Sequence, residues 1–299
     1  MSGKPCINTY DSKKRMGLTD VVIIAFFTLM CLTMILPFWD TLVKSISTET
    51  ENLTLTFRLF PKALSFDGYI GILSQAKLVR AFIINVYVTI VGTILHVFFC
   101  SMTGYALGTN DFWGKRFVIN LLVIAMILPG QVMMIPSFVL YRSLNLLNNV
   151  NVMVISGMIT SFSVLLFRNF YISIPKALHD AAKIDGAGEF RIFAQVYFPM
   201  SKAGLATVMI FQIIGKWNIF FEGVMYINDG SKQPLQVVLS EILSSFVQNN
   251  APASIAAGPK LGMNLQAAAV IIAIVPMILV YPVLQKHFIK GALLGAIKE

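Results

Sequence analysis

Charged side chains are scarce in this sequence. Asp, Glu, Lys and Arg make up 12% of the 299 residues and hydrophobic residues make up 57%, whereas soluble globular domains have about 25% and 45–50%. The mean hydropathy is +0.75. This composition excludes an ordinary soluble domain and predicts an integral membrane protein. The net charge of +9 comes without a dense Lys/Arg run or an RNA-binding aromatic pattern, so no nucleic-acid partner is expected.

Recognisable catalytic motifs are also missing. No G-x-x-x-x-G-K-[ST] phosphate loop occurs, and the nearest fragment is Gly114-Lys115-Arg116. The chain therefore lacks the backbone cradle and the lysine that hold nucleotide phosphates in that motif. The patterns H-E-x-x-H and G-x-S-x-G are absent as well. The sequence predicts no catalytic residue and no cofactor held by this chain.

Cysteine and histidine are too few and too dispersed for a metal centre. They occur only as Cys6, Cys31, Cys100, His96, His179 and His287. Two of the cysteines fall in apolar runs, which fits neither a disulfide framework nor a thiolate metal site. The histidines show no ligand spacing, so polar neighbours or water explain them more simply than a metal or a general base.

Long apolar runs, by contrast, are abundant. A helix needs about 20 apolar residues to cross roughly 30 Å of hydrocarbon. Six segments qualify, namely 19–39, 80–107, 117–141, 150–171, 203–227 and 266–289. Backbone polar groups in lipid must be satisfied within their own segment, so all six are predicted to be helices. The expected fold class is an all-α integral membrane protein with six transmembrane helices.

The distribution of Lys and Arg orients these spans. With the N-terminus in the cytoplasm, 14 of the 23 basic residues fall on the cytoplasmic side and 8 outside, while Lys216 lies within the fifth span. This excess follows the positive-inside rule. Residues 1–18 and 290–299 are then cytoplasmic tails, and the connector between spans 4 and 5 is cytoplasmic too.

That connector holds the charged, glycine-broken stretch LHDAAKIDGAGEFR at 178–191. One short helix with an apolar side is predicted over 173–185, ended by Gly186, from residues at helical spacing: Ile174, Ala177, Leu178 and Ala181. A second periodic set predicts another short helix that ends near Pro199. About ten helical residues extend roughly 15 Å, too short to span a membrane. We therefore expect a helix-turn-helix at the cytoplasmic face.

Two interpretations of this helix-turn-helix are open on physical grounds. Ala181 and Ala182 allow another backbone to approach closely, and the neighbouring charges Asp180, Lys183 and Asp185 can fix the register of a partner. The element would then be a docking site. The alternative is a solvated connector that packs only on its own membrane helices.

The same residues resemble the E-A-A-x-x-x-G-x9-I-x-L-P loop of binding-protein-dependent ABC importer permeases. Asp180, Val196 and Phe198 stand where that family has Glu, Ile and Leu, and these exchanges keep charge or apolarity. The remaining positions match at the family's spacing, as Ala181, Ala182, Gly186 and Pro199.

The resemblance extends over most of the chain. Further matches are Pro37-Phe38-Trp39, Asn85, Gly104-Tyr105-Ala106-Leu107, Leu128-Pro129-Gly130-Gln131, Ile135-Pro136, Tyr281-Pro282 and Gln285-Lys286-His287-Phe288. These look like the carbohydrate branch, the relatives of the maltose permease G subunit. Lys216-Trp217-Asn218, Tyr226-Ile227-Asn228-Asp229 and Pro234-Leu235-Gln236 are similar to the LplC type, which is associated with complex oligosaccharides.

The resemblance implies a fold and a set of partners. It implies the type I ABC importer permease fold in a bacterial cell membrane, with a permease domain at 19–289 and a coupling loop at 173–199. The implied partners are a second, paralogous permease, two copies of a cytoplasmic ATPase that hold ATP and Mg, and an extracellular or periplasmic sugar-binding protein. By that analogy the residues that couple to the ATPase are Asp180, Ala181, Ala182, Asp185, Gly186, Ala187 and Pro199.

The fifth span holds the candidate residues for the sugar pathway, Lys216, Trp217, Asn218 and Glu222. Ionisable side chains within a span are costly unless they face the bundle interior or water. Trp217 could stack on a sugar ring and Asn218 could bond hydroxyl groups. Lys216 and Glu222 are six residues apart, off the i,i+4 spacing, so they could instead pair with other helices.

Two other function classes compete with the importer. An ion-driven carrier would explain buried charges and the missing nucleotide motif, but it predicts inverted repeats, and no similarity between the two halves is visible. A membrane scaffold is the third alternative. Copurification with an ATPase separates the importer from both.

Overall fold

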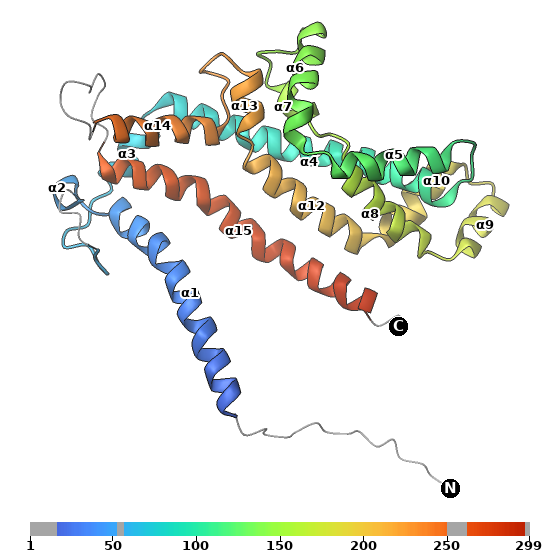
Figure 1. Ribbon diagram of the computed structural model, residues 1–299, viewed down its shortest axis with the longest axis horizontal. Helices are drawn as coiled ribbons and strands as arrows, with labels where there is room; N and C mark the ends of the chain where they lie inside the picture. Colours follow the sequence, from blue (N-terminus) through green and yellow to red (C-terminus); the bar gives the residue numbers. More distant parts are fainter. Residues whose placement is uncertain (1–16, 53–56, 250–261, 297–299) are drawn as a thin grey trace.

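The computed structural model describes residues 17–52, 57–249 and 262–296, and these are almost entirely helical (Figure 1). In chain order the elements are α1 (Leu18–Ser45), α2 (Glu49–Asn52), α3 (Asp67–Leu73), α4 (Ala76–Thr109), α5 (Lys115–Ile127), η1 (Gly130–Met133), α6 (Met134–Ser143), α7 (Asn151–Ile155), α8 (Ser161–Ile172), α9 (Lys176–Ile184), α10 (Glu189–Ile192), η2 (Phe193–Tyr197), α11 (Phe198–Met200), α12 (Lys202–Trp217), α13 (Phe221–Tyr226), α14 (Leu235–Asn249) and α15 (Met263–Ala296). Within the described residues, β-pairing is limited to one isolated bridge, between Ser47 and Leu64. The predicted all-α class is confirmed.

The six predicted spans coincide with helical segments, but not with six continuous helices. Among the described residues, three helices are long and apolar enough to cross a membrane, namely α1, α4 and the part of α15 up to Pro282. The number rises to five if two sharply bent helix pairs each count as one span. Three of the predicted spans, the third, the fourth and the fifth, are each interrupted between two helical segments. Mean hydropathy over a window cannot reveal such interruptions.

Two of the three interruptions have a clear local cause. The third span bends by 106° between α5 and η1, where Pro129 cannot continue the hydrogen bonding of a helix. The fourth span breaks between α7 and α8, where Gly157 has a φ of +65° that side-chain-bearing residues rarely adopt. The fifth is interrupted between α12 and α13. The prediction of one continuous helix over 150–171 is therefore wrong.

The 34-residue helix α4 is the central member of the fold. It packs against α8, α12, α14 and α7, and Figure 1 shows α9 near one of its ends and α3 near the other. Buried polar residues such as Asn85, Thr89 and His96 recur along it, so its buried side is not purely apolar. Close packing is permitted by Gly92 and Gly104, where a Cβ would approach Lys216 and Phe167 respectively.

The two long connectors contain helices that the apolar runs did not predict. In the connector 228–265, α14 buries Leu235, Val238 and Leu239 in a core shared with α15. In the connector 40–79, Glu49 lies at the start of α15, where its carboxylate accepts the Met263 amide at 3.1 Å. A carboxylate at a helix N-terminus satisfies amides that have no partner within the helix. The described residues of both connectors therefore form ordered parts of the fold that pack against or bond to α15.

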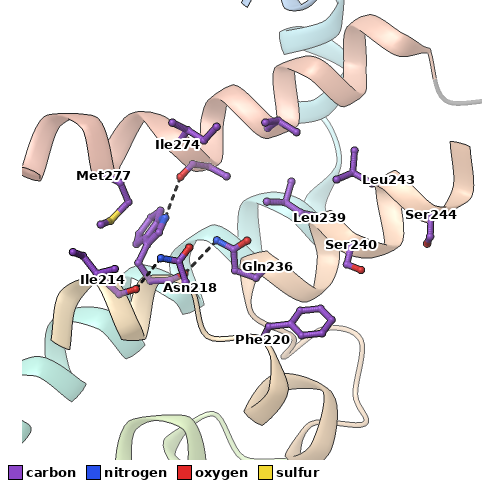
Figure 2. A pocket seen from close by; sticks show the side chains of 13 residues that line it. Ile214, Asn218, Phe220, Gln236, Leu239, Ser240, Leu243, Ser244, Ile274 and Met277 are labelled. Carbon is purple, nitrogen blue, oxygen red and sulfur yellow. Dashed lines mark hydrogen bonds between the residues drawn. The ribbon is translucent and has the colours of Figure 1, made fainter. Parts of the chain in front are cut away.

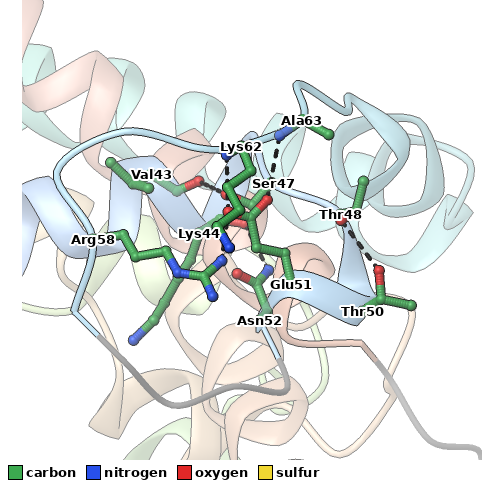
Figure 3. Close-up of polar contacts among 10 residues, drawn as sticks. All are labelled: Val43, Lys44, Ser47, Thr48, Thr50, Glu51, Asn52, Arg58, Lys62 and Ala63. Carbon is green, nitrogen blue, oxygen red and sulfur yellow. Dashed lines mark hydrogen bonds and ion pairs between the residues drawn. The ribbon is translucent and has the colours of Figure 1, made fainter.

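Glu51 organises the rest of the connector 40–79 (Figure 3). Its carboxylate accepts the Lys62 amide at 2.9 Å and the Ala63 amide at 3.5 Å, and it pairs with the Arg58 guanidinium. These donors, the Lys62 amide foremost, lower the pKa of Glu51. Asn52 donates to the Lys44 carbonyl at 3.0 Å and so ties this network to the end of α1.

The two predicted tails are only partly within the described residues. Residues 1–16 and 297–299 lie outside them, so most of the tail predicted at 1–18 is not described. The final helix, α15, continues to Ala296, beyond residue 289 where the last span was expected to end.

The contact between α4 and α8 gives a stability prediction. A Cβ at Gly104 would lie 2.6 Å from the Phe167 Cβ and 3.0 Å from the Val164 carbonyl oxygen, so Gly104→Ala should cost about 1–3 kcal/mol through overpacking. Gly215→Ala is the matched control, because no atom beyond its chain neighbours and its own helix backbone lies within 4 Å of that Cβ and Ala is the better helix former by about 1 kcal/mol. Thermal unfolding in detergent should shift down for Gly104→Ala and not for Gly215→Ala. Equal shifts would refute the packing argument.

Candidate functional site

The predicted helix-turn-helix is present as α9 followed by α10, η2 and α11. Its first helix ends at Ile184, and the chain then reverses through Gly186, whose φ is +78°. Glycine adopts this left-handed conformation without the steric cost that a Cβ brings. The predicted role of Gly186 in ending the helix is confirmed. We call residues 173–200 the hairpin.

The apolar side of α9 faces outward, a direction that the sequence left open, whereas Ile174, the first residue of the predicted stripe, precedes α9 and is buried. Leu178 is 42% exposed, and Ala177 and Ala181 are exposed as well. The side that packs inward carries His179 and Ala182 instead. Periodicity finds an apolar stripe but cannot tell whether the stripe meets the chain's own core or another molecule.

The seven predicted coupling residues divide between these two sides. Five are exposed, namely Asp180, Ala181, Asp185, Gly186 and Pro199. The other two, Ala182 and Ala187, are half-buried against the core beneath the hairpin. Ile184 and Phe190, 87% and 64% exposed, extend the apolar part of the outward surface. The hairpin thus presents small, apolar and acidic groups together.

The inward side of the hairpin is held by Glu189, which sequence analysis missed. Its carboxylate accepts the Tyr105 hydroxyl at 2.7 Å, pairs with Lys183 at 2.9 Å and lies 3.4 Å from His179 Nε2. Lys183 first and Tyr105 second lower the pKa of Glu189 to about 2. Tyr105 belongs to a matched sequence motif, but nothing in the sequence pairs it with a residue 84 positions away.

In the fifth span, Lys216 is turned away from any open space. It is 5% exposed, and its Nζ donates to the carbonyls of Met153, at 2.6 Å, and Ser156. Its stem packs on Gly92, where a Cβ would come within 3.2 Å of the lysine Cε. The ammonium group thus satisfies carbonyls at the end of α7, as cations do at helix C-termini.

Trp217 is also engaged within the fold. Its indole Nε1 donates to the Ala273 carbonyl at 3.0 Å, and its own carbonyl accepts from Asn85 at 3.0 Å and from Gln236 at 3.4 Å. The ring meets Phe82 edge to face, with centroids 5.8 Å apart. The residue joins α12 to α4, α14 and α15.

Asn218 and Trp217 do border one cavity, of about 820 Å³, between α12, α14 and α15 (Figure 2). Asn218 is exposed, and its amide nitrogen donates back to the Ile214 carbonyl at 2.9 Å. Polar groups on the lining come from Asn218, Gln236, Ser240 and Ser244, and the rest is largely aliphatic and aromatic. No lining residue among the described ones carries a charge.

Glu222 lies elsewhere, in a second cavity of about 370 Å³ that Gln131, Ser137 and Tyr226 also line. The structure thus brings Trp217 and Asn218 together and separates both from Lys216 and Glu222. Within the described residues, no three His, Cys, Asp or Glu side chains gather as a metal site would require.

Comparison with known proteins places this geometry among transport proteins. Residues 100–293 match the family described as "Binding-protein-dependent transport system inner membrane component". The polygalacturonan/rhamnogalacturonan transport system permease protein YtcP of Bacillus subtilis (strain 168) is 33% identical, over 94% of this chain and 98% of its own length. Protein LplC of the same strain is 35% identical, over 98% and 99%.

A solved structure agrees with these sequence matches. A chain from the crystal structure of a bacterial ABC transporter involved in the import of the acidic polysaccharide alginate superposes with a TM-score of 0.81. It is 27% identical, and the match covers 91% of this chain and 99% of that one.

The larger cavity predicts where water-soluble reagents can reach. In a background with Cys6→Ser and Cys31→Ser, Asn218→Cys should react with a charged thiol reagent at least about tenfold faster than Ile219→Cys, because Ile219 is 4% exposed. Reaction rates measured by mass spectrometry test this. Equal rates at the two neighbouring positions would show that the cavity is closed to water.

Proposed function

The chain belongs to the family of binding-protein-dependent transport system inner membrane components, and on that premise we propose that it is a permease subunit of an ATP-driven importer of oligosaccharides or polysaccharides. The observation that carries the proposal is near full-length similarity to sugar-transport permeases, together with a hairpin at the matched loop whose apolar and acidic residues are exposed at the protein surface. In this role the chain forms half of the translocation pathway and is not an enzyme.

The hairpin is the proposed contact with the ATPase. A docking surface needs apolar groups to bury and charges to set the register, and the outward side offers Leu178, Ala181 and Ile184 beside Asp180 and Asp185. A solvated connector would have little reason to expose Ile184 and Leu178. The exposed apolar side therefore favours docking over the alternative of a connector that packs only on its own helices.

The cavity of about 820 Å³ is the proposed part of the sugar pathway in this subunit. Amide and hydroxyl groups of Asn218, Gln236 and Ser240 can exchange hydrogen bonds with sugar hydroxyls, while the apolar walls can meet the faces of sugar rings. Trp217 would contribute ring surface only, because its N–H already donates to Ala273. Lys216 is assigned to the fold rather than to the sugar.

The proposed assembly contains further chains. We expect a second, paralogous permease, two copies of a cytoplasmic ATPase and an extracellular or periplasmic sugar-binding protein. ATP and Mg would be bound by the ATPase subunits. The surroundings are a bacterial cell membrane, with both termini on the cytoplasmic side.

The docking proposal predicts a contrast between two glycines of the hairpin. Gly186→Val places a β-branched residue at a φ of +78°, which costs of order 1–3 kcal/mol in strain and should displace the end of α9. Gly188→Val is the matched control, since Gly188 has an extended backbone with a φ of −71° and no atom beyond its chain neighbours lies within 4 Å of its Cβ. Both variants should insert in the membrane.

Copurification of the ATPase with the permease is the readout. We expect it to fall strongly for Gly186→Val and to stay near wild type for Gly188→Val. Normal assembly and normal sugar uptake by Gly186→Val would contradict the assignment of the hairpin as the coupling element.

The proposed orientation predicts a labelling pattern. Single cysteines at Asp67 and Ser231 should react with an impermeant thiol reagent applied to intact cells, whereas a cysteine at Lys183 should react only after permeabilisation. Labelling of Lys183→Cys in intact cells would reverse the topology and remove the hairpin from the side where ATP is available.

A further inference from the structure

We propose that Glu189 is a positioning residue that fastens the hairpin to the end of α4, so that movement of the hairpin is passed to α4. This inference rests on the proposed function, because it concerns how the hairpin acts once an ATPase has docked on it. It assigns no ATPase contact to Glu189 itself.

Glu189 joins three elements through one carboxylate. It is the first residue of α10, it receives Lys183 and His179 from α9, and it accepts the hydroxyl of Tyr105 from α4. The Tyr105 bond is the long-range connection, because the two residues are 84 positions apart. Removing the carboxylate removes polar links among α9, α10 and α4 at the same time, while the apolar core around Tyr105 stays in place.

The hydrogen bond between Tyr105 and Glu189 is strong although the Glu189 side chain is partly exposed. Tyr105 is 4% exposed and lies among the rings of Tyr197 and Phe193, with centroids 4.9 and 5.4 Å away. A buried hydroxyl that donates to an ionised carboxylate forms a charge-assisted bond, which is shorter and stronger than a neutral one. Because the pKa of Glu189 is held at about 2, the carboxylate stays charged at any cytoplasmic pH.

The Lys183 pair adds less to the fastening. Lys183 and Glu189 side chains are 51% and 46% exposed, and exposed ion pairs are generally worth about 0–1 kcal/mol. Lys183 therefore acts mainly by lowering the pKa of Glu189, while the hydrogen bond from Tyr105 connects the hairpin to α4.

The hairpin has two covalent connections, one to α8 at its start and one to α12 at its end, and the one to α12 is not straight. It runs through the π-helical turn η2 and then bends by 81° into α12 near Ser201. Such irregular turns can absorb a displacement before it reaches α12. The route through Glu189 and Tyr105 instead enters a continuous helix of 34 residues.

That helix reaches the cavity. Asn85 on α4 donates to the Trp217 carbonyl, and Trp217 lines the cavity. Roughly 30 Å of helix separates Tyr105 from Asn85 at 1.5 Å per residue. A rigid displacement at the Tyr105 end is therefore transmitted to the residue that joins α12 to α14 and α15.

The test separates coupling from assembly. Glu189→Gln keeps an acceptor but loses the charge, and Tyr105→Phe removes only the hydroxyl, so both should fold. We expect both variants to copurify with the ATPase within about twofold of wild type. Sugar uptake should nevertheless fall about fivefold or more, so that the ATP hydrolysed per sugar imported rises.

Two controls make this result specific. Glu241→Gln removes a comparably exposed ion pair, with Lys77, and should leave the ratio unchanged. The double variant Tyr105→Phe/Glu189→Gln should be no worse than the more affected single variant, because both changes act on the same bond, which Glu189→Gln weakens and Tyr105→Phe removes.

Three outcomes decide the inference. An unchanged ratio of ATP hydrolysed to sugar imported in both single variants overturns the inference. Loss of ATPase copurification in Glu189→Gln alone also overturns it, because Glu189 would then be part of the docking surface. If wild-type protein brings no ATPase with it, the proposed function fails, whatever the variants do.

Discussion

A carbonyl group inside the apolar part of a membrane protein must find a donor, and this requirement shapes the centre of the molecule. Where the fourth span breaks, three carbonyls in a row lose their helical partners. Lys216 donates to Ser156, the ring of His96 lies 3.0 Å from the Gly157 carbonyl oxygen, and the Cys100 thiol approaches that of Met158 at 3.8 Å. Unsatisfied, each would cost several kcal/mol in lipid.

These donors come from α4 and α12, so satisfying the break also fixes the helices. His96 and Cys100 are one turn apart on α4, and Lys216 closes α12. Gly92 leaves room for the lysine stem between them. The break in the fourth span, the buried Lys216 ammonium group and the close approach of α4 to α12 therefore depend on one another. It explains why Lys216 is unavailable to a sugar while its neighbour Asn218 is exposed to the cavity.

The sequence predicted those features that depend on composition over long windows or on single conformational exceptions. The positions of the six apolar segments along the chain, the turn at Gly186 and the short helices on either side were all predictable. The α14 helix was missed because its 15 residues fall short of a span and follow a polar connector. The bends were missed because hydropathy averages over them, although Pro129 marks the sharpest one.

The direction in which side chains point was the other feature that the sequence could not predict. The stripe of Ile174, Ala177, Leu178 and Ala181 was found from the sequence. The burial of Ile174 and the outward direction of the other three depend on which face Tyr197 and Phe193 cover, and that is a tertiary property. Likewise, no local pattern links Glu189 with Tyr105. Both facts require the three-dimensional arrangement, and together they define the hairpin as an element with a fastened side and a free side.

The central claim, that this chain moves sugar by responding to an ATPase, is tested most directly with the complex purified from its own membrane and reconstituted in vesicles. The measurement is uptake of labelled oligosaccharide delivered by its binding protein, with ATP enclosed and ionophores present. The account predicts uptake that requires enclosed ATP and is unaffected by collapse of ion gradients. Uptake that persists without ATP and is abolished by ionophores would contradict it.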